Sequence, residues 1–331
     1  MKKILFILLF LPFSFFAKAQ DTSRVKDGHK WQLISTQGFP EKREDCTFVE
    51  VDNLFYLVGG RGIKPVDVFD PKTNSWQAKS KSPVEINHFQ AVSFKDKIYA
   101  VGGMNGGFPH EKPLENIYTY DTKTDEWQKV PLMPAGKRRG SGGAVIYNNK
   151  IYFVCGIQDG HYDGTVAWFD EFDPKTGEWH GLPDAPHARD HFNAVVIGDK
   201  LYLAGGRRTS AKTREVIQLT VPEIDVFDFK KQEWTTLPSS QNIPTQRAGC
   251  TAVKYKHYLV VIGGESISQK ESHHEAEAFD TEKGSWTELP GLLTGRHDTG
   301  AITFRKKIYI AAGSANRGGG PDQNTIEVLK P

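Results

Sequence analysis

Residues 97–103 read KIYAVGG, a short strand-forming run that carries an aromatic side chain and ends in two glycines. The same pattern, or a near relative of it, occurs six times at intervals of about fifty residues, and a Trp follows five of the copies. The pairs are Gly59-Gly60, Gly102-Gly103, Cys155-Gly156, Gly205-Gly206, Gly263-Gly264 and Ala312-Gly313, and the tryptophans are Trp76, Trp127, Trp179, Trp234 and Trp286. A strand-rich period of this length indicates a circular array of small β-sheets.

Each copy predicts four short antiparallel strands. In the second copy these are expected at residues 89–94, 98–101, 117–120 and 127–130, with tight turns between the first two and between the last two. One such unit cannot bury both its faces, so the units must stack. Glycine lets neighbouring sheets approach closely, and the Trp supplies a large apolar surface between them.

The two ends of the chain predict how the array closes. The sixth copy has three strands, the last at residues 326–329, and it lacks a Trp strand. Residues 30–34 read KWQLI and form an unassigned strand with a Trp. We therefore predict that this N-terminal strand completes the last blade as its outer strand, which removes open sheet edges. The expected fold is an all-β, six-bladed propeller, with residues 20–331 as a single domain.

The glycine pair, the aromatic residue three positions before it and the spaced Trp resemble the kelch repeat family. The resemblance extends from Trp31 to Leu329. The departures are Cys155 and Ala312 in place of the first glycine, and Val260 in place of the aromatic residue. The resemblance implies a kelch β-propeller and leaves its function open.

The first nineteen residues have the pattern of a secretory signal peptide. Lys2 and Lys3 precede an apolar run at 4–16, and Ala17-Lys18-Ala19 precedes a cleavage point near Gln20. The run is too short for a good membrane span. We therefore expect an exported protein, periplasmic or extracellular, with no membrane span.

The overall charge gives no sign of nucleic acid binding. The chain has 42 Lys and Arg against 40 Asp and Glu, and removal of the signal peptide with its three lysines brings the balance close to zero. We therefore expect no nucleic acid partner. The partners that remain are a small sugar or glycan, or another protein, and we expect a monomer.

Cysteine and histidine patterns give no metal site in the sequence. Cys46, Cys155 and Cys250 fall inside apolar strands, and their odd number favours buried thiols over a full set of disulfides. His273-His274-Glu275 lies in a polar loop without a third ligand of matching spacing. The Gly318–Gly320 run is read as a flexible loop, because no helix follows it. We expect no metal and no other cofactor.

One position in each copy carries the main functional signal. Sixteen residues before the first residue of each glycine pair stand Arg43, Ile86, Arg139, Arg189, Arg247 and Arg296. This is where the innermost strand of each blade should begin, so we expect the side chains near it to surround the mouth of the central channel. The predicted ligand-binding residues are Arg43, His88, Arg139, Arg189, Arg207, Arg247 and Arg296. Asp190, His191, Glu265 and His297 are candidates for proton transfer. The alternative is that each Arg uses its five donors to tie blade loops together.

Three functions remain open at this stage. The first is the binding of a sugar, sugar acid or glycan on the ringed face of the channel. The second follows from a resemblance to the sialic-acid mutarotase-like epimerases, which are small exported kelch propellers; it implies a general acid, a general base and an arginine for the carboxylate. The third is a scaffold for protein–protein interactions.

A fourth class is disfavoured. Copper oxidases of the galactose oxidase type share the propeller, but they need paired Tyr and His ligands, a Cys–Tyr link and an additional domain. The cysteines of this chain fall in strand positions, and no such domain is expected in it. We therefore do not expect copper-dependent oxidation.

Overall fold

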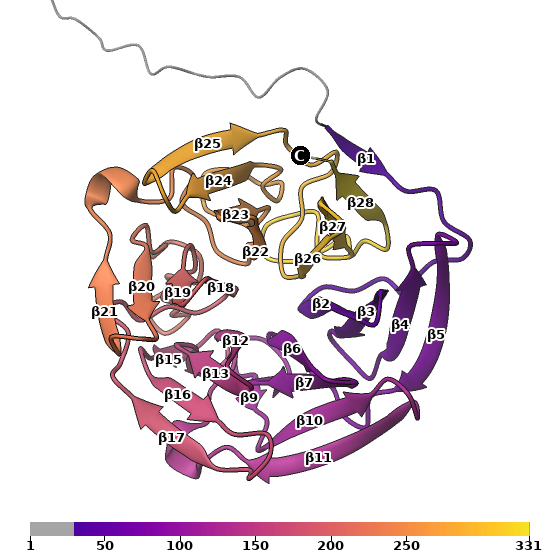
Figure 1. Cartoon of the computed structure of the whole chain (residues 1–331), viewed down its shortest axis with the longest axis horizontal. Helices are drawn as coiled ribbons and strands as arrows, with labels where there is room; N and C mark the ends of the chain where they lie inside the picture. Colours follow the sequence, from indigo (N-terminus) through magenta and orange to yellow (C-terminus); the bar gives the residue numbers. More distant parts are fainter. Residues whose placement is uncertain (1–29, 331) are drawn as a thin grey trace, which may run out of the picture.

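Six four-stranded antiparallel sheets form a ring around a central channel in the computed structural model, which describes residues 30–330 (Figure 1). We number them as blades 1 to 6 in chain order. The inner strands are β2, β6, β12, β18, β22 and β26, and the outer strands are β5, β11, β17, β21, β25 and β1. The predicted six-bladed propeller is therefore confirmed.

The first three blades contain twelve strands. Blade 1 consists of β2 (Cys46–Val51), β3 (Leu54–Gly59), β4 (Pro65–Asp70) and β5 (Ser75–Lys81). Blade 2 consists of β6 (Gln90–Phe94), β7 (Lys97–Val101), β10 (Asn116–Asp121) and β11 (Glu126–Leu132). Blade 3 consists of β12 (Gly143–Tyr147), β13 (Lys150–Val154), β16 (Phe169–Phe172) and β17 (Trp179–Leu182).

The remaining blades repeat this plan. Blade 4 consists of β18 (Ala194–Ile197), β19 (Lys200–Leu203), β20 (Asp225–Asp228) and β21 (Glu233–Thr236). Blade 5 consists of β22 (Thr251–Tyr255), β23 (Tyr258–Ile262), β24 (Ala276–Asp280) and β25 (Ser285–Leu289). Blade 6 consists of β26 (Ala301–Phe304), β27 (Lys307–Ala311), β28 (Ile326–Leu329) and β1 (Trp31–Leu33).

Blade 6 closes the ring with the two ends of the described chain, as the sequence predicts. β1 pairs antiparallel with β28, and Trp31 lies opposite Leu329. The Trp31 side chain is buried in the core between blades 5 and 6, and its indole Nε1 donates to the carbonyl of Pro290 at 2.8 Å. The last blade is thus held by residues from both ends of the ring, with β1 as its outer edge strand.

Two small hairpins lie in the loops after the glycine pairs: β8 (Met104–Asn105) with β9 (Lys112–Pro113), and β14 (Ile157–Asp159) with β15 (Asp163–Thr165). Single 3₁₀ turns occur at Ala135–Lys137 and Ser239–Gln241. None of the described residues forms a helix long and apolar enough to span a membrane. The hairpins shape the channel mouth, as described below.

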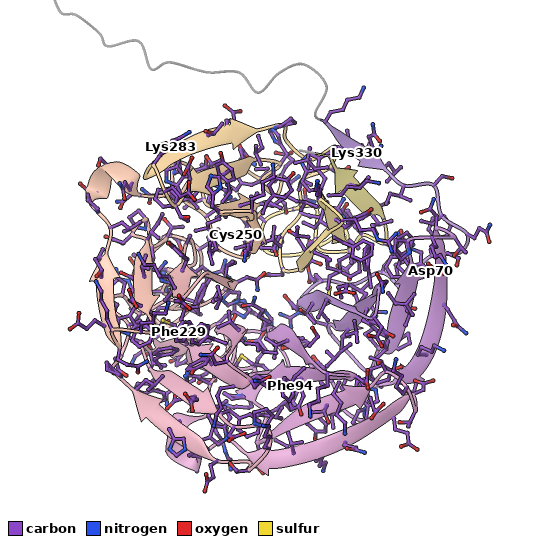
Figure 2. All side chains as sticks on the ribbon, in the orientation of Figure 1. Asp70, Phe94, Phe229, Cys250, Lys283 and Lys330 are labelled. Atoms are coloured by element: carbon purple, nitrogen blue, oxygen red, sulfur yellow. The ribbon has the colours of Figure 1, made fainter. Side chains whose placement is uncertain are left out.

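The core consists of apolar and aromatic side chains packed between neighbouring blades. Phe169 of blade 3, for example, contacts Phe227 and Trp234 of blade 4 with ring centroids 4.9 and 5.3 Å apart. All three cysteines are buried and unpaired, and burial raises the pKa of the Cys46 and Cys155 thiols to about 12. Charged side chains such as Lys283 and Lys330 lie at the rim, whereas Cys250 lies near the channel (Figure 2).

Candidate functional site

The five repeated arginines are buried inside the blades. Each donates to the carbonyl of the first residue of its glycine pair, at 2.6–3.1 Å. Each also forms an ion pair with an acid on the third strand of the same blade, and these pairs are Arg43–Asp67, Arg139–Asp170, Arg189–Asp225, Arg247–Glu277 and Arg296–Glu327. The sixteen-residue spacing therefore reflects a bond within one blade.

Blade 2 has no such arginine, and it also lacks the acid. Ile86 takes the arginine position, and Tyr118 lies opposite Ala100 just as Asp67 lies opposite Leu57. Ile86 and Tyr118 both belong to the apolar core between blades 1 and 2. The two positions therefore change together from a charged pair to an apolar one. This agrees with a role in holding the blade together.

These positions correct the expectation that the arginines surround the channel mouth. Arg43, Arg139, Arg189, Arg247 and Arg296 are at most 1% exposed, and none lines the pocket described below. A buried guanidinium has to be paired on all sides, and the blade carbonyls and acids meet that need. We therefore assign these five to blade packing. Of the seven residues predicted to bind ligand, only His88 and Arg207 line the pocket.

The residues that surround the axis stand two positions after the arginine register. We call them the axial ring: Asp45, His88, Ser141, His191, Gly249 and Asp298. All six have a left-handed backbone with φ of 51–59°. From His88 onward each N–H donates to the carbonyl of the preceding member at 2.7–3.1 Å, and Cys46 closes the circle by donating to Asp298. Left-handed φ is costly for residues other than glycine, so five members hold backbone strain at the axis.

A polar pocket of about 200 Å³ opens above this ring at the channel mouth. Its wall comes from the axial ring, from the residues before two ring members, Glu44 and His297, and from the loops after the glycine pairs. The lining includes Glu44, Asp45, Arg61, His88, Phe108, His161, Arg207, Glu265, His297 and Asp298. A cavity of about 30 Å³ continues below it between the ring members, including His88 and His191. Three of the four predicted proton-transfer residues, His191, Glu265 and His297, thus line these cavities.

One side of the pocket is built around Glu265. Arg207 pairs with one carboxylate oxygen, and the backbone N–H of Gly318 donates to the other at 2.7 Å. Burial opposes ionisation of Glu265, but His297 and Arg207 outweigh it and hold the carboxyl pKa well below its usual range. Conversely, burial disfavours a charged His297, but the carboxylates of Glu265 and Asp298 raise its pKa. The Gly318–Gly320 run, read from the sequence as a flexible loop, here supplies a hydrogen bond donor.

The opposite side is built around Asp45. Arg61 Nε lies 2.6 Å from Asp45 Oδ2, and Arg61 Nη2 lies 3.0 Å from Glu111 Oε1. Burial and the neighbouring Asp298 raise the pKa of Asp45 well above its usual range, despite Arg61. Asp45 Oδ1 is 3.1 Å from His88 Nε2, so the two groups face each other at hydrogen-bond distance. The pKa values of Asp45 and Glu265 are thus shifted in opposite directions within one pocket.

Three buried histidines meet between these sides. His88 and His191 come from the axial ring, and His161 comes from the turn of the β14–β15 hairpin. Their ring centroids are 4.8–5.0 Å apart. Burial lowers the pKa of His88 and His191 well below the ordinary value, with the other rings adding to the effect. These two rings are therefore neutral imidazoles.

Sequence reasoning missed His161, Glu111 and Phe108, which lie in the loops after the glycine pairs and outside the repeat register. Loop contacts put them in place: the backbone N–H of His161 donates to Pro109, and that of Ala211 donates to His161. The available signal was the unusual length of those loops, which are the usual place for binding residues on a rigid scaffold. Asp190, the fourth predicted proton-transfer residue, is fully buried behind His191.

The part of the channel between the inner strands has a less polar lining than the mouth. Two cavities of about 340 and 520 Å³ lie between the inner strands and are lined largely by apolar and uncharged side chains such as Val92, Ile146, Ala252 and Thr303. The polar pocket with its charged side chains lies at the mouth, where the loops converge. This makes the mouth the candidate site.

The fold and the repeat together define a kelch-repeat β-propeller. The family model described as the Attractin/LZTR1 beta-propeller matches residues 17–266, and the Kelch motif model matches residues 246–293. The chain therefore belongs to the Attractin/LZTR1 β-propeller family, with kelch repeats.

Relatives at lower identity agree on this architecture. The Kelch-like protein terF of Aspergillus terreus is 27% identical over 305 residues, which cover 86% of this chain and 64% of that protein. Human Kelch-like protein 23 is 23% identical over 266 residues, which cover 78% of this chain and 43% of that protein. The chain thus spans about two thirds or less of the length of these relatives. The solved structure of YjhT matches with a TM-score of 0.73 at 16% identity, over 88% of this chain and 95% of YjhT, which concerns the fold alone.

Proposed function

We propose that this chain is an exported kelch propeller that binds a neutral, hydroxyl-rich small molecule, such as a sugar, in the pocket at the channel mouth. The mixed lining of that pocket carries the proposal. Four acidic residues, Glu44, Asp45, Glu265 and Asp298, stand beside three basic ones, Arg61, Arg207 and His297. Hydroxyl groups both donate and accept, so they match such a mixed set of partners.

The same lining bears on the choice between a neutral sugar and a sugar acid. An anionic ligand needs an excess of cationic groups facing it. Both guanidinium groups of this pocket already pair with carboxylates, Arg61 with Glu111 and Arg207 with Glu265. We therefore rank neutral sugars ahead of sugar acids.

An aromatic side chain at the rim supports a sugar ligand. Phe108 is 62% exposed, and its ring centroid lies 5.4 Å from that of His161. Pockets for small ligands combine an aromatic surface with a few well-placed polar groups. The apolar face of a sugar ring can pack on Phe108 while its hydroxyls reach the charged groups below.

A mutarotase-like epimerase is the second candidate, and a specific observation favours it. Asp45 has a raised pKa and Glu265 a lowered one within one pocket. Two carboxyl groups whose environments separate their pKa values in this way provide a general acid and a general base. Interconversion of anomers needs both, one at the ring oxygen and one at the anomeric hydroxyl.

A protein scaffold is the third candidate. It rests on exposed apolar side chains in loops after the glycine pairs, Ile63, Phe108 and Ile267, which are 53–62% exposed. They belong to loops of three different blades, so a protein partner would have to bridge the channel mouth. A sugar needs only the pocket itself.

Binding measurements on two variants test the sugar proposal. Thermal-shift screening and calorimetry with neutral sugars and sugar acids should give a neutral sugar as the best ligand. We expect Phe108→Ala to weaken its binding roughly tenfold, and the charge-removing pair Arg207→Gln/Glu265→Gln to abolish it. Arg208→Gln, an exposed neighbour, is the control that leaves binding unchanged. Equal binding by all four proteins, or no sugar binding at all, refutes the proposal; proton-exchange NMR on any bound sugar then decides whether anomers interconvert.

Export forms a separate part of the proposal. Residues 1–19, with the charged start and the apolar run, lie outside the described residues. Expression of the full chain followed by N-terminal sequencing should give a protein that begins at Gln20 in the exported fraction. An uncleaved protein retained in the cytoplasm contradicts it.

A further inference from the structure

Three histidine side chains converge at the floor of the pocket in a way that sugar binding does not require. His88, His161 and His191 are each at most 8% exposed. Each offers a ring nitrogen, and these nitrogens lie within 4.8 Å of one another. Burying three imidazoles together is costly unless their polar atoms find partners. The question is what those partners are.

The outward-facing nitrogen of each ring is held by an oxygen acceptor. Nδ1 of His161 lies 3.1 Å from both carboxylate oxygens of Glu111, and Nδ1 of His191 lies 2.6 Å from Asp190 Oδ1. Nδ1 of His88 lies 2.9 Å from the amide oxygen of Asn87. In His161 and His191 such contacts place the ring proton on Nδ1 and turn the two Nε2 lone pairs toward each other, while Nε2 of His88 lies 3.1 Å from Asp45 Oδ1. This is the outer shell that metal-binding histidines have in proteins.

The inward-facing nitrogens have metal-ligand spacing. Nε2 of His161 and Nε2 of His191 are 3.2 Å apart. Metal–nitrogen bonds of about 2.0–2.1 Å in a tetrahedral site place two nitrogens about 3.3 Å apart. Two lone pairs repel each other at this separation, and a cation bound between them turns that repulsion into attraction. The His88 ring, within 4.8 Å, has to move by at most about 1.5 Å to join them.

From this geometry we propose that His88, His161 and His191 bind a divalent transition metal ion of the zinc type through their Nε2 atoms. Three imidazoles suit zinc and its neighbours better than magnesium or calcium, which prefer oxygen. A three-histidine set leaves a fourth position that faces the pocket, where Asp45 Oδ1 is the nearest carboxylate oxygen to His88. Glu111 and Asp190 stand behind the rings and offset the charge of the ion.

The inference differs from the sequence expectation of no metal, and it does not rest on the sugar proposal. The three ligands follow no regular spacing, because they are 73 and 30 positions apart and one lies in a loop outside the repeat. His273 and His274, the histidines that the sequence singled out, lie elsewhere: His273 contacts Glu275 and Ser266. An ion at this floor is a site in its own right, next to the pocket.

Zinc and cobalt titrations of the purified protein test the site. After treatment with a chelator and its removal, calorimetry with Zn²⁺ should show one ion bound per chain. His161→Gln and His191→Gln should each weaken binding by about a hundredfold or more. His180→Gln, an exposed histidine on β17, is the matched control and should bind like the wild type. Co²⁺ should give the intense visible bands of a tetrahedral site, and these should be lost in His161→Gln.

Two outcomes overturn the proposal. One is zinc binding by the wild type that is no tighter than that of His161→Gln and His191→Gln; the close nitrogen pair then shares a proton. The other is a wild-type Co²⁺ spectrum with only the weak bands of an octahedral ion. The spectrum is measured on the wild type, so it decides the matter even if a histidine variant fails to fold. Sugar binding measured with and without the metal separates this site from the proposed function.

Discussion

The repeated arginines and the axial ring stand only two residues apart in five of the six blades, yet they serve different purposes. The arginine points into its own blade and binds the same two partners, a glycine-pair carbonyl and a third-strand acid, in all five copies. The ring residue turns toward the axis because its backbone is left-handed, and it meets the residues of other blades. A position that has the same residue type in most copies therefore indicates blade architecture. The positions beside it, whose residue type varies from blade to blade, contribute to the proposed binding site.

The strongest test breaks one arginine–acid pair. Arg247→Leu leaves Glu277 buried without its cation, and we expect unfolding free energy to fall by about 3–5 kcal/mol. Replacement of both partners by Leu should recover much of that loss, because no charge remains buried. Urea unfolding followed by Trp fluorescence measures both. His161→Gln is the comparison from the pocket. If it lowers the unfolding free energy as much as Arg247→Leu does, the repeated arginines and the pocket residues do not differ in their contribution to stability.

Blade 2 offers the reverse experiment. Ile86→Arg puts a guanidinium where the third strand has Tyr118 instead of an acid, and we expect a loss of about 3 kcal/mol from the unpaired buried charge. Addition of Tyr118→Asp should restore at least about 1 kcal/mol through a new pair. A double-mutant cycle on unfolding free energies measures this coupling. Additive effects of the two changes would show that the arginine register does not depend on its acid.

A smaller effect is expected behind the histidines. Glu111→Gln keeps the shape of the side chain that holds His161 Nδ1 but removes its charge, and we expect zinc affinity to fall roughly 10- to 100-fold. The melting temperature of the metal-free protein should change far less than in Arg247→Leu. Zinc competition with a chelating dye measures the affinity. Glu115→Gln, at an exposed acid that follows the β8–β9 hairpin, is the control. A similar loss of zinc affinity in that variant would mean that any negative charge near the site has this effect.

The fold could be predicted from the sequence almost completely, because six copies of one pattern each predict the same four-stranded blade. Blade number, strand order and closure through Trp31 follow from spacing and from the need to bury both faces of each sheet. The same spacing locates the repeated arginines. It does not predict where their side chains point, because spacing does not say whether a residue faces the axis or its own blade.

The site was predictable only in part. His88, His191, Glu265 and His297 stand in repeat register, so alignment of the copies found them. His161 and Glu111 lie in loops of irregular length, and their contact with His191 and Arg61 depends on how loops of different blades fold over the channel. Sequence periodicity contains no information on that packing. The contact among His88, His161 and His191 is therefore visible only in the folded structure.

The last test concerns pH and the pair formed by His297 and Glu265. The groups facing His297 are Glu265, Asp298, Glu44 and Arg207, with the Ser272 hydroxyl at Nδ1. The raised pKa of His297 gives stability that is fully present below the ordinary value of 6.5 and is lost as pH rises through the folded value. The lowered pKa of Glu265 gives stability that is present above its ordinary value of 4.5 and is lost as pH falls toward the folded value. The pair should thus stabilise the fold most between these limits.

We expect His297→Gln to remove the alkaline part of this dependence, with an effect smaller than that of any arginine variant. Unfolding free energies of wild type and variant, measured from pH 5 to 9, should differ most at the acid end and converge toward the alkaline end. A constant difference across this range would mean that His297 contributes packing and not charge. That outcome would remove His297 from the charged groups of the pocket, and Arg61 and Arg207 would remain as the cations of its lining.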